Sequence, residues 1–380
     1  MLREVQRVSR LLLSLLCAAA LLASFEGRAN AAGVTTHADA AIRASQWFVS
    51  GVDATARDWI LANPGALQAG AAFPDWGYAF GHPDAAEDTH WPPFHQVAGD
   101  YVHETYPLPW DDDTKKLATF LLGIRSHWVA DLDWHGLGGV QEGFIDVASA
   151  QEFNGDWSAA HSNSDTGGDF MAGTELALNW TSSSWYVPTT DVLAIYARLG
   201  YTDITTSELA NDMALMQLEQ RGIKLGGALL AGPYLQRSPL LGDQYQDYFV
   251  GGVDDLGIQT AFNWDPLITW MRSGTGGLLA STSQDLRARL DAAHRAEGEG
   301  DGAALDAALA ALGSNARPRS VADLARLGIA VQETARGVYL TNVTSEARAT
   351  NPAAQIAVSP MGEDRSLTIA AADPFAYLGT

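Results

Sequence analysis

"FLLGIRSHWVADLDWHGLG", residues 120–138, is the stretch that decides the fold of this chain. It carries His127, Asp131 and His135 at a constant spacing of four residues. At ~100° per residue the three positions span only ~80° of a helix, so their side chains share one face. The same face holds small and apolar residues, namely Gly123, Ile124 and Trp128. We therefore predict a helix whose imidazoles and carboxylate point into the protein, where they need protons, partners or a metal ion.

The overall composition is that of a folded protein with a large core. The chain has 380 residues, of which 47% are hydrophobic and 18% charged, and this length suggests two or three domains. The formal net charge of −22 disfavours nucleic acid as a partner and gives no bulk attraction to anionic membranes. Bound cations can still make the electrostatic potential positive at one place on the surface.

The first 31 residues have the features of a secretory signal peptide. A basic start precedes a short apolar run, Leu11 to Leu22, and the cleavage-site pattern Ala29-Asn30-Ala31 follows. The apolar run is too short to cross a bilayer as a helix. Cleavage predicts a secreted or periplasmic protein that starts at Ala32 and has lost its one cysteine, Cys17, so that it has no disulfide. The alternative is a buried apolar N-terminal helix.

Residues 32–273 are expected to form a largely helical domain. Apolar residues recur with helical periodicity in four segments: residues 40–52, 114–134, 190–199 and 207–230. Two stretches between them, residues 73–93 and 153–169, are rich in glycine, proline and aspartate. We expect these two stretches to be long loops, and loops of this kind often carry function.

The pattern changes in the last third of the chain. Residues 274–336 are rich in alanine, glycine and charge, which indicates a helical extension or a semi-flexible connector. Residues 337–380 have the β-like pattern of "GVYLTNVT" and "RSLTIAAADP". No internal repeat of 20–50 residues is visible.

Histidines and carboxylates at metal-ligand spacing also occur outside the first stretch. Asp165 follows His161 by four residues, and His37 lies five residues after the predicted new N-terminus. Asp75 and His90 both fall within residues 73–93. Imidazole and carboxylate ligands without sulfur are the set that zinc accepts in hydrolytic sites. Each of these signals alone also fits an ordinary hydrogen-bonded core histidine.

The remaining histidines and one acidic run receive other interpretations. Three histidines have surroundings typical of solvated side chains: His82, His103 and His294. His95 fits either a residue that orients a metal ligand from behind or a structural residue. The run Asp111 to Asp113 is expected to cap the following helix, with calcium binding as the alternative.

The order of these motifs resembles a known family. The segments "AGVTTH", "FPD", "DTHWPPF", "HWVADLDWH" and "AAHSNSDTGGD" are similar to those of the zinc-dependent phospholipase C/D family, most closely its glycosylphosphatidylinositol-specific phospholipase D branch. The likeness continues through "WYVP", "SPLLGDQYQDYFVGGVDD" and "ARGVYL". It implies an all-α fold, a multi-helix zinc domain like those of phospholipases C and single-strand nucleases, with a small β-rich segment at the C-terminal end.

The resemblance also implies a ligand set for three Zn²⁺ ions per chain. One ion is assigned to the α-amino nitrogen and carbonyl oxygen of Ala32 with His37, the second to Asp75, His90 and His127, and the third to His135, His161 and Asp165, while Asp131 bridges the first two. The chain departs from the family pattern at two positions. Broad-range phospholipases carry Glu where this chain has Asp165, and several relatives begin with Trp instead of Ala32. Asp169 stays open as an alternative to Asp165.

The implied activity is hydrolysis of phospholipid or glycosylphosphatidylinositol head-group phosphodiesters by a zinc-bound hydroxide. Asp75 is the candidate catalytic residue, because it can orient or deprotonate the attacking water. The partners implied are the lipid substrate and a transient contact with a membrane surface, and nucleic acid is not favoured. The ligand pattern leaves phospholipase C and phospholipase D cleavage both open.

Two other functions stay open at this point. A single-strand nuclease uses the same metals and needs aromatic side chains for base stacking, which could also line a lipid groove: Trp76, Tyr78, Trp91 and Trp157. A non-catalytic module would hold zinc for structure only. The last residues, "ADPFAYLGT", resemble the first strand of an FG-GAP β-propeller blade, and Ca²⁺ is expected only if a propeller follows.

Overall fold

The computed structural model of the chain describes residues 33–48, 50, 52–135, 143–174, 181–246, 248, 251–274, 330–334 and 337–341. Helices make up most of this part, and the predicted all-α fold is confirmed. The helices are α2 (Val34–Trp47), α3 (Ala56–Ala62), α4 (Pro64–Ala72), the 3₁₀ turn η1 (Phe73–Asp75), α5 (Trp76–Phe80), α6 (Pro83–His90), α7 (Pro92–Thr105), α8 (Asp112–His135), α9 (Phe144–Glu152), α10 (Trp157–Thr174), α11 (Thr189–Leu199), α12 (Thr206–Leu230), α13 (Gly232–Arg237), α14 (Pro239–Gln244) and α15 (Val253–Ser273). None of the described helices is long and apolar enough to cross a membrane.

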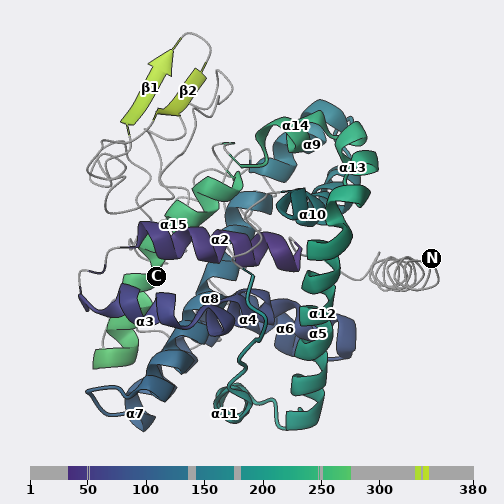
Figure 1. The fold of residues 1–380 in the computed structure, drawn as a ribbon. Helices are drawn as coiled ribbons and strands as arrows, with labels where there is room; N and C mark the ends of the chain where they lie inside the picture. The colour runs from purple at the N-terminus through teal and green to yellow at the C-terminus, as the bar shows by residue number, and fades with distance from the viewer. Residues whose placement is uncertain are drawn as a thin grey trace, which may run out of the picture.

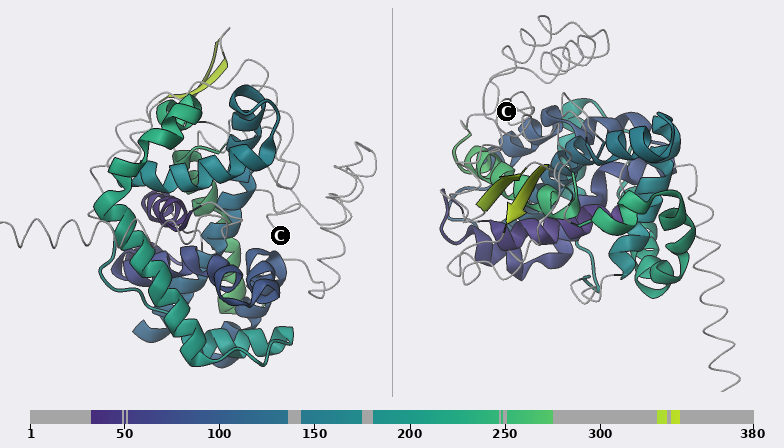
Figure 2. Two further views of the ribbon diagram at one scale, coloured as in Figure 1. Left: turned by 90° about the vertical axis from the view of Figure 1, so that its right-hand side faces the viewer. Right: turned by 90° about the horizontal axis from the view of Figure 1, so that it is seen from above.

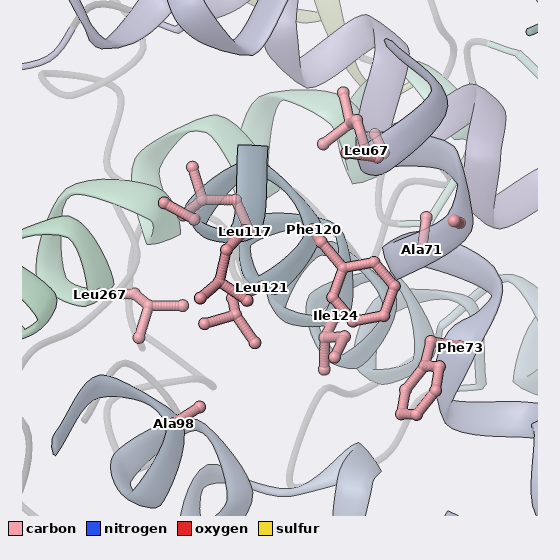
Figure 3. Packing of buried hydrophobic residues seen from close by; sticks show 14 of the residues in the cluster. Leu67, Ala71, Phe73, Ala98, Leu117, Phe120, Leu121, Ile124 and Leu267 are labelled. Atoms are coloured by element: carbon pink, nitrogen blue, oxygen red, sulfur yellow. The ribbon is translucent and has the colours of Figure 1, made fainter. Parts of the chain in front are cut away.

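Helix α8 is the centre of the domain. It begins after Asp111, whose carboxylate accepts hydrogen bonds from the backbone N–H and the hydroxyl of Thr114, so the predicted capping role is confirmed. From Leu117 to His135 every side chain of α8 is buried, since α4, α7 and α15 pack around it. A helix surrounded on all sides needs no polar face toward solvent. Figures 1 and 3 show α8 between these neighbours, with Phe120 directed at Phe73 and Leu121 at the α7–α15 side.

Helices α4 and α8 pack with their backbones in close contact. A Cβ on Gly70 would overlap the carbonyl oxygen of Phe120, and a Cβ on Gly123 would overlap that of Leu67. Only glycine at both positions allows this approach. The close approach also affects the polar face of α8, because it brings the carbonyl oxygen of Ala71 within 2.7 Å of Nδ1 of His127.

The two stretches that we expected to be loops are helical, so that expectation is wrong. Residues 73–90 form η1, α5 and α6, and residues 157–174 form the continuous helix α10. In α10, Gly167 and Gly168 lie where a Cβ would press on Tyr234, Leu241 and Trp134. Tight packing against these side chains outweighs the low helix propensity of glycine. The first predicted helix, residues 40–52, is also displaced and runs from Val34 to Trp47 as α2.

The described C-terminal residues form one antiparallel hairpin. Strand β1 (Ala330–Thr334) pairs with β2 (Gly337–Thr341), with Ala330 opposite Thr341 and Thr334 opposite Gly337. The β-structure thus begins before residue 337, within the segment that we predicted to be a helical extension or a semi-flexible connector. The signal peptide, Ala32, most of residues 274–336 and the propeller-like end lie outside the described residues, and the domain boundaries stay predictions.

The close α4–α8 contact gives the first testable expectation. Substitution Gly123→Ala must push α4 away from α8, because the added Cβ meets the α4 backbone, and we expect a loss of about 1–3 kcal/mol in the free energy of unfolding. Gly232→Ala is the matched control, since no atom lies within 4 Å of the added Cβ. Denaturant unfolding of both variants measures the difference, and equal stability of the two would contradict the packing described above.

Candidate metal centre

One face of α8 presents His127, Asp131 and His135 to the interior, as the spacing predicts. The three residues are 0%, 6% and 3% exposed. Side chains from the turn η1 and from helices α2, α6 and α10 converge on this face: Asp75, His37, His90, His161 and Asp165. Five imidazoles and three carboxylates from distant parts of the chain therefore meet at one place.

Asp131 is the common member of this cluster. Its Oδ1 lies 3.2 Å from Nε2 of His37 and 3.6 Å from Nδ1 of His135. Its Oδ2 lies 3.2 Å from Nε2 of His127 and 3.7 Å from Nε2 of His90. One carboxylate thus faces four imidazoles, and the rings of His37 and His127 stack with centroids 3.6 Å apart.

The tautomers of His90 and His127 follow from their backbone contacts. Nδ1 of His90 lies 2.8 Å from the carbonyl oxygen of Ala86, and Nδ1 of His127 lies 2.7 Å from that of Ala71. A carbonyl oxygen only accepts, so both Nδ1 atoms carry the hydrogen and both Nε2 atoms are acceptors in the neutral rings. The two Nε2 atoms nevertheless face each other at 3.0 Å. Two lone pairs at this distance repel unless a proton or a cation lies between them.

The second part of the cluster joins α8 to α10. Nε2 of His161 lies 2.9 Å from Oδ2 of Asp165, one helical turn further on, and Nε2 of His135 lies 3.6 Å from Oδ1 of the same carboxylate. Trp134 donates its Nε1–H to Oδ1 of Asp165 at 2.9 Å, which fixes the orientation of the carboxylate. His135 contacts both Asp131 and Asp165 and so connects the two parts.

The donor set fits divalent metal ions. Ligand atoms fall into three groups whose members lie within 4.8 Å of one another: His37, His127 and Asp131; Asp75, His90 and His127; and His135, His161 and Asp165. Buried atoms that contact another ligand but form no well-aligned hydrogen bond occur in all three groups, among them Nε2 of His37, Oδ1 of Asp75 and Nε2 of His161. Such atoms are costly in an interior unless something binds them. Imidazole with carboxylate is the ligand chemistry of zinc.

The electrostatics of the metal-free cluster show where positive charge is favoured. Burial lowers the pKa of His90, but the hydrogen bond and charge of Asp75 and the charge of Asp131 outweigh it and raise the pKa to about 9. Burial raises the pKa of Asp165, but hydrogen bonds from His135 and His161 bring it down to about 2. The pKa of Asp131 is likewise held well below its usual range by the surrounding imidazoles, despite burial. The cluster therefore holds anionic carboxylates that attract a proton or a metal ion.

Asp169 has a different role from Asp165. Its Oδ1 accepts the backbone N–H groups of Thr35 and Thr36 at 2.9 and 2.8 Å, and the hydroxyl of Thr36 at 3.2 Å. These are the free N–H groups at the start of α2, so Asp169 satisfies that helix end from another helix. A Cβ on Gly33 would overlap this carboxylate, which explains the glycine there. This geometry favours Asp165 over Asp169 as the ligand.

The contacts of His95 are those of a structural residue and not of a residue that orients a metal ligand. Nη1 of the fully buried Arg125 donates to Nδ1 of His95 at 3.1 Å, and the guanidinium stacks on Trp128 at 3.9 Å from the ring centroid. Burial and the charge of Arg125 keep the pKa of His95 well below its usual range, so the ring is neutral. His95 belongs to none of the three ligand groups.

Comparison with known proteins gives a family match over the region of the cluster. Residues 36–209 match the model of the family described as zinc dependent phospholipase C. The chain is similar to this family over that segment, which is a little under half of its length. All eight described donors lie within these limits. No solved structure matches the chain.

Three proteins to which the chain is similar are named phosphatidylinositol-glycan-specific phospholipase D. The protein of Dictyostelium discoideum is 40% identical over 240 residues, which is 63% of this chain and 25% of that protein. The Homo sapiens and Rattus norvegicus proteins are each 38% identical over 243 residues, 62% of this chain and 29% of theirs. The chain thus spans little more than a quarter of these relatives.

The structure brings together eight of the nine residues that the resemblance predicted as ligands. The ninth, Ala32, lies just before the first described residue, Gly33. Asp169 was considered only as an alternative ligand, so its capping role was not foreseen, and neither was the presence of Glu219 on α12 near Asp75. Burial and the charge of Asp75 raise the pKa of Glu219 to about 7. The sequence signal for Asp169 is its position two turns after His161 on the same helix; Glu219 has no such signal.

A matched pair of substitutions separates the two α10 carboxylates. Asp165→Asn removes a charged donor from the third group, and we expect the purified protein to lose one equivalent of zinc. Asp169→Asn keeps an amide oxygen that can accept the same backbone N–H groups, so zinc content should stay unchanged. Elemental analysis decides; zinc loss in the Asp169 variant alone would reverse the assignment.

The raised pKa of His90 predicts that the stability of the protein depends on pH differently with and without metal. A His90 pKa of about 9 against about 6.5 in the unfolded chain stabilises the metal-free protein below pH 6.5 and is lost as pH rises through 9, by up to about 3 kcal/mol. With zinc bound, the metal takes the place of the proton on His90, and zinc binding weakens as pH falls because protons compete for the ligand atoms. We therefore expect stability to decline from pH 6.5 to 9 only in the metal-free protein, as followed by denaturant unfolding. The metal-free His90→Asn variant should lack this decline.

Proposed function

We propose that the chain is a secreted zinc-dependent phosphodiesterase that hydrolyses head-group phosphodiesters of phospholipids or glycosylphosphatidylinositol anchors. The observation that supports it most strongly is the sharing of donors: His127 belongs to two of the three ligand groups, and Asp131 faces histidines of all three. Metal ions that share ligands lie close enough to act on one phosphate. The name of the relatives, phosphatidylinositol-glycan-specific phospholipase D, supplies the substrate class.

The ligand assignment follows the three groups. Asp75, His90 and His127 would hold one zinc; His37, Asp131 and, through its backbone atoms, Ala32 would hold a second; His135, His161 and Asp165 would hold the third. When bound, zinc lowers the pKa of a coordinated water and stabilises negative charge on phosphate oxygens. The protein's part is to fix these donors: Ala86 and Ala71 accept from the histidines and Trp134 donates to Asp165.

Asp75 is our candidate for the residue that orients the attacking water. It lies at the end of η1, and its Oδ1 is 3.4 Å from Nε2 of His90 and 3.9 Å from Nε2 of His127. Its side chain is 13% exposed, against 9% for that of Asp131. A carboxylate in this place can accept the proton of a water that attacks phosphorus.

Aromatic side chains border the cluster and would line the substrate path. Trp157 stacks on His161 with ring centroids 4.7 Å apart and is 37% exposed. Tyr78 lies 5.5 Å from the His90 ring, and both Tyr78 and Trp91 donate to the carboxylate of Glu87. Trp76, in contrast, is fully buried and donates to Tyr196, so it offers no stacking surface to a base. Trp76, one of the four aromatic residues that a nuclease could use for base stacking, is therefore inaccessible to a base.

Substrate and bond specificity are tested on one panel. We expect the zinc-loaded protein to cleave vesicles that contain phosphatidylinositol or a glycosylphosphatidylinositol-anchored protein, and to leave single-stranded DNA uncut. Phosphatidic acid as the lipid product identifies D-type cleavage, and diacylglycerol identifies C-type cleavage. A zinc-loaded protein that cuts only DNA, or neither substrate, would falsify the lipid assignment.

Substitution of Asp131, the carboxylate shared by the ligand groups, is the most direct test of the proposed activity. Asp131→Asn removes the charge that faces four imidazoles, and the rate on the lipid substrate should fall by more than about 100-fold, since even outer-shell substitutions cost 10–100-fold. His103→Asn, an exposed histidine on α7, is the control and should retain full activity. Circular dichroism with zinc analysis separates loss of metal from loss of fold, because metal binding and folding are coupled.

A further inference from the structure

Helix α12 has apolar residues on two opposite sides. Its inward side packs against α10 and α2 and buries Leu209, Met213, Met216 and Ile223. Its outward side carries four more leucines that stay exposed, and we name them the leucine stripe: Leu215, Leu218, Leu225 and Leu229. Their exposed fractions are 36%, 44%, 73% and 76%.

The four residues form a continuous band. At ~100° per residue they lie within ~80° of one another around the helix, and at ~1.5 Å per residue they extend over ~21 Å of its length. Surface leucines usually occur singly, whereas a contiguous apolar band indicates an interaction site. Leu225 and Leu229 are the most exposed large hydrophobic residues among those described.

The charge around the stripe differs from that of the whole chain. The C-terminal half of α12 carries Arg221 and Lys224 near the most exposed leucines and has no acidic residue after Glu219. The acidic residues Glu208, Asp212 and Glu219 all precede them on the helix. The complete chain has a net charge of −22. Lys224 and Arg221 donate to Thr181 and Ser183, respectively, and both are exposed beside the leucines. An apolar band with basic neighbours is complementary to phosphate head groups above acyl chains.

The position of α12 connects this surface to the metal centre. The helix contacts α2, α5 and α10, which carry or adjoin the ligands. In the left view of Figure 2, α12 runs past α2, which is seen end-on. A bilayer that meets the outer side of α12 would therefore be separated from the ligand-bearing helices by this one helix.

We propose that the leucine stripe is the surface by which the protein docks on a phospholipid bilayer, with Leu225 and Leu229 inserted between head groups and Arg221 and Lys224 beside phosphates. This inference rests on the proposed function for the reason to approach a membrane. It assigns that contact to α12, and it is tested by binding, without reference to cleavage.

The test uses the full chain and a double variant, Leu225→Gln/Leu229→Gln. We expect the wild type to sediment with phosphatidylcholine vesicles that contain phosphatidylinositol, and the double variant to bind about tenfold more weakly, since two leucines lose roughly 1.4 kcal/mol or more of interfacial burial. Leu61→Gln is the control: this leucine on α3 is 48% exposed but lies outside the stripe, so binding should be unchanged.

A second readout separates this surface from the catalytic proposal. Hydrolysis of a monomeric, water-soluble phosphodiester should be equal in wild type and double variant, while hydrolysis in vesicles falls with binding. Vesicle binding without any hydrolysis would sink the proposed function and leave the docking surface standing. Hydrolysis of the soluble ester with no vesicle binding, or with binding equal in both proteins, would overturn the docking surface alone.

Other occupants of the stripe give distinct results. If a second copy of the chain covers it, sedimentation velocity without lipid will show a dimer that the double variant dissociates. If another segment of the same chain covers it, the double variant will show faster hydrogen exchange in α12 and a lower unfolding temperature without lipid. Either result overturns the bilayer assignment.

Discussion

A single buried carboxylate facing four imidazoles is the constraint on which the rest of this structure depends. Asp131 lies within 3.7 Å of nitrogen atoms of His37, His90, His127 and His135, which come from α2, α6 and α8. So many polar groups cannot be buried together without compensation, and the attraction between carboxylate and cations is the compensation available. The helices must therefore be placed so that Asp131 and the imidazoles meet, and packing elsewhere serves this placement.

The packing that achieves it is unusually close at one crossing. Because Gly70 and Gly123 let the α4 and α8 backbones touch, the carbonyl of Ala71 reaches His127 and fixes which ring nitrogen faces the cluster. Capping acts in the same way at α2, where Asp169 accepts the first free N–H groups and anchors the helix that carries His37. Backbone contacts thus determine side-chain chemistry several ångströms away.

Helices α8 and α12 have different roles in the domain. Helix α8 is buried from Leu117 onward and presents donors inward, whereas α12 packs by one side and exposes leucines on the other. The C-terminal half of α12 carries two basic residues and no acidic residue after Glu219. An interior that concentrates metal ligands and an adjacent surface suited to head groups form a consistent arrangement for chemistry on a lipid phosphate, because substrate and reactive groups then meet at the interface.

The sequence by itself determined the helical class, the inward face of α8 and, through the family resemblance, the identity of the donors. These follow from local rules: a spacing of four on a helix and the ligand preferences of zinc. It predicted loops where η1, α5, α6 and α10 are helical, since glycine, proline and aspartate report local propensity and not the packing that overrides it. Only the tertiary structure distinguished Asp165 from Asp169, withdrew Trp76 from the surface and left the outer leucines of α12 exposed. Each of those outcomes depends on which distant residue comes into contact, and spacing along a chain does not contain that information.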